Sequence, residues 1–304
     1  HHGDEIFTKA KEKNVHVLYE SSVCAGTPII KMLNEELAGN KISKISGMLN
    51  GTSNFILSQM ENGADFDPTL KFAQEKGYAE PDPSFDIEGM DAAHKIGILS
   101  SIAIGTSLPP NDFYVEGIKD IDSTDFKYAS KLGFSIKHLA VASLTENEVQ
   151  LRAHPVLVSS DSYLAGLKGV RNGIEVETDL VGTLHVAGSG AGQESTASGL
   201  ISDLVYLSNV SSNSSINLNK RIKMNIQPID EMEFKYFFKI KTLSKDMNLN
   251  KIEKIFQKNQ VSISAENFDD FYIVIISESF IENKKDSIMA SLNNLSEVAS
   301  VKSI

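Results

Sequence analysis

Apolar positions recur along most of this chain with either a helical or a strand period. The clearest helical pattern begins at about Gly89, where Met90 and Ala93 are followed by the strongly apolar run Ile96–Ile104. Shorter helical patterns occur at Asp4–Lys13, Ile29–Leu37, Ser53–Met60, Phe66–Lys76, Phe126–Leu132 and Thr196–Leu207. Strand patterns occur at Val15–Glu20, Lys41–Met48, around Ile118 and Ile121, at Ile136–Thr145 and Val149–Val158, and as a strand pair within Val170–Glu177 that turns at Asn172-Gly173. This alternation predicts an α/β (α+β) fold, with a mixed, largely antiparallel sheet and helices on one face.

A second, shorter alternation follows a change in composition. Residues Ser208–Asn219 are rich in serine and asparagine, which is typical of a linker. The expected elements beyond it are a strand (Tyr236–Lys241), a helix (Leu249–Asn259), two strands (Val261–Ala265 and Phe271–Ser277), a helix (Lys284–Leu295) and a strand (Val298–Lys302). That β-α-β-β-α-β order is ferredoxin-like. We therefore divide the chain into a domain at 1–210, a linker at 211–233 and a domain at 234–304.

Composition and charge exclude some classes of binding partner and cellular compartment. The 304 residues carry a net charge of -11, with a pI near 5.2, which disfavours nucleic acid or an anionic membrane surface as partner. The single cysteine excludes an internal disulfide and fits a reducing, cytoplasmic compartment. We find no apolar run near the ~20 residues that a membrane span needs, and the start does not resemble a signal peptide. The initial His1-His2 is either native or a tag remnant.

The segment with the most chemistry is Gly77–Lys95, GYAEPDPSFDIEGMDAAHK, which ends on Lys95. Its two prolines exclude a helix in the first half. Asp91 is placed to open the following helix, so that Asp91 and Lys95 stand one turn apart on one face. Taken alone, such a pair is most often a solvated ion pair, but the apolar helix behind it indicates burial in a cleft, where an amine can do acid–base chemistry. The acidic side chains of the segment fit no calcium-loop spacing, so small-molecule binding is favoured over metal.

Glu20–Pro28 is interpreted from its residues as a strand-to-helix connection with a partly buried acid. Two other segments each allow a structural and a functional interpretation. Asn50-Gly51-Thr52 is either a hairpin turn or a strand-to-helix junction whose free N–H groups receive a carboxylate. Gly188–Gly192 is either a tight turn or an anion site at a helix N-terminus. His138, His154 and His185 are interpreted as ordinary strand residues, because nothing at metal-ligand spacing accompanies them.

Four motifs in the same order resemble the homoserine dehydrogenase family. The family pattern GYAE-x-DP-x-x-D-x-x-G-x-D-A-x-x-K is matched without a gap at Gly77–Lys95. The other three motifs are YESSVCAGTPII (Tyr19–Ile30), GMLNGTSNFIL (Gly47–Leu57) and GSGAGQESTASGLISDL (Gly188–Leu204). The resemblance implies conversion between homoserine and aspartate semialdehyde with NAD or NADP, in threonine, methionine and isoleucine biosynthesis. It also implies an ACT-like regulatory domain at 234–304.

The resemblance assigns roles to residues at matching positions. Lys95 and Asp91 are the implied catalytic pair, with Lys95 as proton donor and acceptor. The implied substrate-binding residues are Glu80, Asp86, Asp91, Thr52 and Tyr78. The implied cofactor contacts are Gly77, Glu80 and Gly190. A monovalent cation, Na⁺ or K⁺, is implied at Glu20, Val23, Ala25 and Thr27, where oxygen ligands suit a hard cation.

The resemblance also bears on what surrounds the site. Family members carry a dinucleotide-binding (Rossmann) unit ahead of these motifs, and no strand–glycine loop–helix unit precedes them here. We therefore expect a fragment that lacks most of the cofactor domain and is inactive alone, and the choice between NAD and NADP stays open. A homodimer or homotetramer and threonine as effector are further expectations. The alternative is a non-enzymatic amino-acid sensor built on the ACT-like module; a different dehydrogenase on the same scaffold is a third possibility.

Overall fold

The computed structural model describes residues 2–108, 113–209, 224–243, 247–269 and 271–304, and these form two compact units. The first unit comprises residues 1–123 and 135–226, and the second comprises 124–134 and 227–304. The helix α7 (Ser123–Lys131) thus packs with the C-terminal unit, although the chain before and after it belongs to the first. Most of the expected linker, 211–233, falls outside the described residues.

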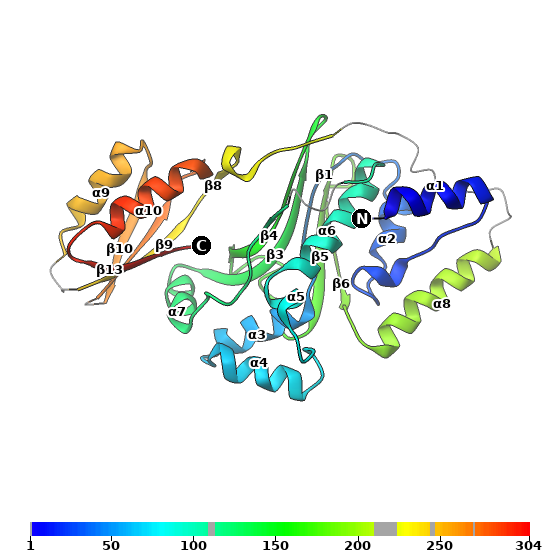
Figure 1. Cartoon of the computed structure of the whole chain (residues 1–304), viewed down its shortest axis with the longest axis horizontal. Helices are drawn as coiled ribbons and strands as arrows, with labels where there is room; N and C mark the ends of the chain where they lie inside the picture. The colour runs from blue at the N-terminus through cyan, green and yellow to red at the C-terminus, as the bar shows by residue number, and fades with distance from the viewer. Residues whose placement is uncertain (1, 109–112, 210–223, 244–246, 270) are drawn as a thin grey trace. The chain divides into compact units, whose positions relative to one another are not determined.

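A mixed sheet forms the centre of the first unit (Figure 1), as the sequence predicted. Its order is β2-β4-β3-β1-β5-β6, with β7 beside β4. Strand β1 is antiparallel to both β3 and β5, whereas β2 and β7 run parallel to β4. The strands are β1 (Ile42–Met48), β2 (Tyr114–Val115), β3 (Phe134–Leu144), β4 (Glu148–Ser159), β5 (Arg171–Thr178), β6 (Thr183–Ser189) and β7 (Asn225–Ile226).

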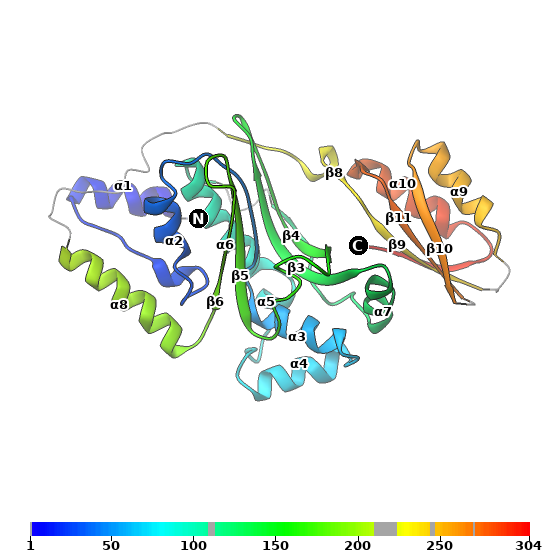
Figure 2. The same ribbon diagram turned by 180° about the vertical axis from the view of Figure 1, so that it is seen from behind.

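Helices cover one face of this sheet. The helix α6 crosses it in Figure 1 and lies behind the strands in Figure 2. Ala140 and Ala142 of β3 join the core formed with Ile96 and Leu99 of α6, while the alternate residue Val141 packs on the other face beneath residues 164–167. The helices of the unit, α6 included, are α1 (Gly3–Lys13), α2 (Ile29–Lys31), which continues as a π-helix at Met32–Glu36, α3 (Gly51–Glu61), α4 (Phe66–Glu75), α5 (Ser84–Ile87), α6 (Met90–Ile104) and α8 (Gln193–Asn209).

Some local predictions were wrong. Val15–Glu20 forms no strand: it runs extended into a 3-10 turn at Glu20–Ser22. Ile118 and Ile121 are buried, but the short strand is β2, a few residues earlier. Asp91 does not cap α6, because Gly89 holds that position with φ 88°.

Asn172-Gly173 makes no turn and lies within the single strand β5. The Asn172 amide donates to the carbonyl of Met48 at 2.6 Å, and Gly173 leaves room for Leu167, whose Cδ1 lies 2.0 Å from where a Cβ would be. Asn172 therefore bonds to the neighbouring strand β1, and Gly173 packs against Leu167. The two residues alone do not reveal these contacts.

The C-terminal unit has the predicted β-α-β-β-α-β order. Its sheet, β10-β11-β9-β13, is antiparallel throughout, and α9 and α10 lie together on one face (Figure 1). The aromatic side chains of Phe238 and Phe256 pack 5.2 Å apart within its core. The elements are β9 (Phe237–Thr242), α9 (Leu249–Lys258), β10 (Ile263–Asp269), β11 (Tyr272–Ser277), α10 (Lys285–Asn293) and β13 (Val298–Ser303), with a small ladder of β8 (Glu233–Phe234) and β12 (Phe280–Ile281). None of the helices in the described part of the chain is long and apolar enough to cross a membrane.

Candidate active site

Asp91 and Lys95 form the expected ion pair on the first turns of α6. Lys95 Nζ lies 2.7 Å from Asp91 Oδ2, and the two side chains are only 19% and 20% exposed. Lys95 also donates to the main-chain carbonyl of Leu49 at 2.9 Å. This is not the solvated surface pair of the simpler interpretation. An ammonium has three N–H donors, so one remains for a ligand after these two bonds.

Asp86 is linked to the Asp91–Lys95 pair through the side chain of Asn50, for which the sequence predicted no role in the site. Asn50 Nδ2 donates to Asp86 Oδ1 at 2.7 Å and to Asp91 Oδ2 at 2.8 Å. Asn50 Oδ1 accepts from the N–H of Ser53 at 2.8 Å and so caps α3. The strand-to-helix junction at Asn50-Gly51-Thr52 was recognised, and the preference of asparagine for N-caps was the available signal.

Thr52 and Tyr78 lie next to this group. Thr52 Oγ1 donates to the carbonyl of Tyr78 at 2.6 Å, which ties the first turn of α3 to the acidic loop. The Tyr78 ring is partly exposed and packs edge-on against Phe55. The first two N–H groups of α3, those of Gly51 and Thr52, have no helical partner. Together with the helix dipole they form a site suited to a carboxylate.

Gly77 and Glu80 belong to the exposed part of the loop. Gly77 has φ 73°, a left-handed conformation that favours glycine. Glu80 is exposed, and its main-chain carbonyl accepts from Gln74 Nε2 at 3.1 Å. Within the described residues its carboxylate makes no hydrogen bond, so the structure does not bring it into the Asp86–Asp91–Lys95 group.

The four residues expected at a cation site are all buried. The Glu20 carboxylate accepts from the N–H groups of Ile30 at 2.9 Å and Lys31 at 2.8 Å, where α2 begins. Burial raises the pKa of Glu20, and those N–H bonds and the Lys31 charge oppose the rise. Ala25 has φ 23°, in a region that non-glycine residues rarely adopt. The remaining members are Val23 and Thr27, and the Thr27 hydroxyl has no hydrogen-bond partner in the described structure.

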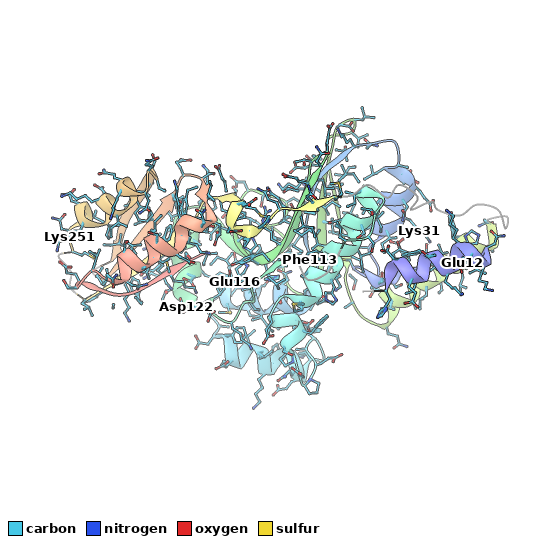
Figure 3. All side chains as sticks on the ribbon, turned by 45° about the horizontal axis from the view of Figure 1, so that its top comes forward. Glu12, Lys31, Phe113, Glu116, Asp122 and Lys251 are labelled. Carbon is cyan, nitrogen blue, oxygen red and sulfur yellow. The ribbon has the colours of Figure 1, made fainter. Side chains whose placement is uncertain are left out.

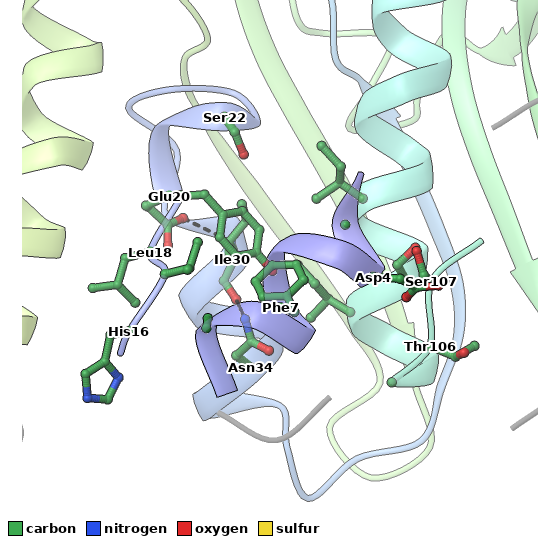
Figure 4. Close-up of a pocket in the computed structure, with 18 of the residues that line it drawn as sticks. Asp4, Phe7, His16, Leu18, Glu20, Ser22, Ile30, Asn34, Thr106 and Ser107 are labelled. Carbon is green, nitrogen blue, oxygen red and sulfur yellow. Dashed lines mark hydrogen bonds between the residues drawn. The ribbon is translucent and has the colours of Figure 1, made fainter. Parts of the chain in front are cut away.

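The described part of this unit contains cavities on two sides of the Glu20–Thr27 segment. One, of about 920 Å³, is lined by Phe7, Leu18, Glu20 and Ile30 among others (Figure 4), and includes His94 of α6 but neither Asp91 nor Lys95. A more open hollow of about 530 Å³ lies at the start of α8, lined by Gly26, Ser189, residues 191–195 and Ser198. The glycine-rich segment therefore borders a hollow at a helix N-terminus, which is the geometry that binds anionic groups.

Gly190 is buried beside this hollow and packs against Asn172. A Cβ at Gly190 would lie 1.0 Å from Asn172 Oδ1. Asn172 holds the carbonyl of Met48, and the next residue, Leu49, accepts from Lys95. The packing of Gly190 is thus linked, through Asn172, Met48 and Leu49, to the position of Lys95.

We expect Gly190→Ala to lower the free energy of unfolding by about 1–3 kcal/mol, because the added methyl displaces Asn172 from a tightly packed position. Urea denaturation measures the loss. Gly39→Ala is the matched control, since nothing lies within 4 Å of a Cβ at Gly39, and it should be close to neutral. Equal stability of the Gly190 and Gly39 variants would contradict the packing role.

His138 packs against Gly89, the residue that precedes α6. This buried histidine of β3 donates from Nε2 to the carbonyl of Glu116 at 2.9 Å, and Glu116 is labelled in Figure 3. A Cβ at Gly89 would lie 2.9 Å from the same nitrogen. Burial lowers the pKa of His138 from its ordinary 6.5 to about 4.

Stability should therefore fall as the pH drops from about 6.5 to about 4. In this window the unfolded chain binds a proton at His138 that the folded chain does not, which costs up to about 3 kcal/mol. Urea denaturation at several pH values measures the effect. His138→Gln should remove this part of the acid sensitivity, whereas His185→Gln, at an exposed histidine paired with Glu175, should retain it. An unchanged pH dependence in His138→Gln would refute the assignment.

Known proteins match these motifs and this fold. The sequence pattern of the family described as homoserine dehydrogenase matches residues 28–205. A homoserine dehydrogenase of Pseudomonas aeruginosa is 39% identical, over 98% of this chain and 72% of that protein. The crystal structure of a homoserine dehydrogenase from Thiobacillus denitrificans superimposes with a TM-score of 0.92 at 36% identity, covering 100% of this chain and 73% of that one.

A hyperthermophilic archaeal homoserine dehydrogenase, solved in complex with NADPH, superimposes with a TM-score of 0.59 at 32% identity, over 70% of this chain and 62% of that one. The motif at Gly77–Lys95, the fold and these matches agree with one another. The chain belongs to the homoserine dehydrogenase family.

Proposed function

We propose that this chain binds homoserine and aspartate semialdehyde and that Lys95 exchanges the proton in their NAD(P)-linked interconversion. The observation that carries the proposal is the third donor of Lys95. Asp91 and the Leu49 carbonyl fix the ammonium in place with two bonds and leave one N–H for the substrate oxygen.

In aldehyde reduction this N–H donates to the carbonyl oxygen, on which negative charge develops, and the proton follows. In the reverse direction the neutral amine that this transfer leaves accepts the hydroxyl proton of homoserine at Nζ. The nicotinamide, when bound, supplies or accepts the hydride. Asp91 Oδ2 already accepts from Lys95 and Asn50, so Oδ1 remains to accept from the substrate hydroxyl.

The amino-acid end of the substrate fits the surrounding groups. The free N–H groups of Gly51 and Thr52 suit its carboxylate, and the carboxylates of Asp86 and Glu80 suit its ammonium. Because Glu80 is exposed, its loop has to close onto the substrate before Glu80 can bind the ammonium. The ring of Tyr78, two residues earlier, then lies beside the substrate. These roles are proposals that rest on the arrangement around Lys95.

The cofactor fits the hollow at the start of α8. Backbone N–H groups there suit an anionic group, and we propose Gly190 with Gly77 and Glu80 as the contacts from this chain. The archaeal relative was solved with NADPH, which supports use of NAD(P) here. We also propose a cytoplasmic location, a homodimer or homotetramer, a monovalent cation at Glu20, Val23, Ala25 and Thr27, and threonine as an effector of the ferredoxin-like unit.

Homoserine-dependent reduction of NADP and of NAD tests the proposal. The assay compares this chain alone with the chain joined to the part of the Pseudomonas aeruginosa relative that the match leaves uncovered. Activity in either form supports the function. Absence of activity in both forms, with both folded, would overturn it and favour an amino-acid sensor.

A further inference from the structure

We propose that Asn50 is a positioning residue for the reaction, whose side-chain amide holds Asp86 and Asp91 in the arrangement that Lys95 requires. This inference rests on the function proposed above, and it adds a residue that none of the motif assignments includes. Its basis is a single amide group that lies between the two carboxylates and caps a helix at the same time.

Both N–H donors and the oxygen of the Asn50 side chain form hydrogen bonds. Its two Nδ2 hydrogens are donated to two different carboxylates, at 2.7 Å to Asp86 and 2.8 Å to Asp91. Its Oδ1 accepts from Ser53, which fixes the orientation of the amide so that the nitrogen faces the acids. Asn50 is only 6% exposed, so water does not readily replace it.

The backbone that carries Asn50 is held on both sides. On the strand side, the Met48 carbonyl accepts from Asn172. On the helix side, a Cβ at Gly51 would lie 2.9 Å from the Val170 carbonyl, and Asn54 donates to the carbonyl of Gly169 at 2.8 Å. The backbone of Asn50, and with it the side-chain amide, is therefore held in place on both sides.

The consequence concerns Lys95 directly. Asp91 Oδ2 accepts from both Asn50 and Lys95, and Lys95 is also bonded to Leu49, the residue before Asn50. Asn50 thus fixes the rotamer of Asp91 relative to Lys95. It also separates Asp91 from Asp86 with a neutral donor, without which the two carboxylates would repel each other. A displacement of about 1 Å at such a site can cost roughly 10²-fold in rate.

Two substitutions separate the positioning role from the capping role. Asn50→Asp keeps the size of the side chain and the cap but replaces both donors with an acceptor. Asn50→Ser keeps a cap but cannot bridge two carboxylates. Asn62→Asp, at the other end of α3, where Asn62 donates to the Ser58 carbonyl, is the matched control. All are compared with the wild type in the form that shows homoserine-dependent activity.

We expect Asn50→Asp to lower kcat about 100-fold and Asn50→Ser about 10-fold, with a smaller change in KM. Asn50→Asp places a third carboxylate beside Asp86 and Asp91 and should also lower the melting temperature, whereas Asn50→Ser should stay near the wild type. The solvent deuterium isotope effect on kcat should rise in both, because proton exchange with Lys95 becomes slower relative to the other steps. Asn62→Asp should leave kcat and the isotope effect unchanged.

The inference is overturned if Asn50→Asp folds with wild-type kcat and isotope effect, because the bridge is then dispensable. It is also overturned if loss of activity follows the melting temperature alone across the three variants. An inactive wild type would instead defeat the proposed function, and this inference with it.

Discussion

Replacing Lys95 by alanine should lower kcat for homoserine oxidation by about 10²–10⁴-fold, the range of general acid–base catalysis. The substitution removes the group that we propose exchanges the hydroxyl proton, and Asn50 holds its ion-pair partner Asp91 as an acceptor. The free energy of unfolding should fall as well, because one partner of a mostly buried ion pair is removed. Asp91 keeps the Asn50 donor, so the variant should still fold. Steady-state kinetics and urea denaturation measure the two quantities.

Two further variants make the expectation specific. Lys95→Arg keeps the positive charge and the bond to Asp91, but arginine stays protonated and cannot exchange the proton, so kcat should remain low. Lys119→Ala removes another lysine that pairs with an acid of the same loop, Glu88 at 3.1 Å, on the surface. It should keep wild-type kcat. Appreciable turnover in Lys95→Ala would remove Lys95 from its role.

The Asp91–Lys95 ion pair was predictable because its geometry is local. Asp91 and Lys95 are four residues apart on one apolar helix, so a helical period alone places them together. Asn50 was not predictable in the same way. Its partners Asp86 and Asp91 lie 36 and 41 residues away along the chain, and only tertiary packing reveals that one amide bridges them.

The fold shows the same division between local and distant effects. Strands and helices with a long, clear period were confirmed, and so was the β-α-β-β-α-β order of the C-terminal unit. Val15–Glu20 has a strand-like pattern but pairs with no neighbouring strand in the described structure. Asn172-Gly173 has the composition of a turn, yet contacts with Met48 and Leu167 keep it extended. For Asn172-Gly173 distant contacts overrode the local signal, and for Val15–Glu20 the local pattern finds no neighbouring strand among the described residues.

A distant contact also determines the place of α7, and it gives the largest expected effect on stability. Asp125 of α7 is fully buried. Its carboxylate lies 2.6 Å from Lys239 Nζ of β9 and forms a second ion pair with Lys302 of β13. Lys239 is itself nearly buried and also donates to Thr124. The Asp125 carboxylate therefore pairs with two ammonium groups inside the C-terminal unit.

We expect Asp125→Asn to destabilise this unit by about 3–5 kcal/mol, because it removes a fully buried carboxylate that pairs with two ammonium groups. Urea denaturation followed by tyrosine fluorescence measures the loss, since the chain has no tryptophan and Tyr128 packs 5.4 Å from Tyr272 within the unit. Asp286→Asn, at an exposed acid in the first turn of α10, is the matched control and should cost less than about 1 kcal/mol.

Adding Lys239→Met and Lys302→Met to Asp125→Asn should restore much of the lost stability. The single substitution removes the carboxylate but keeps both ammonium groups, and apolar side chains of similar volume remove those charges too. If the triple variant is instead less stable than Asp125→Asn, the cluster stabilises the unit through its hydrogen bonds, and charge balance is not what holds α7 in place.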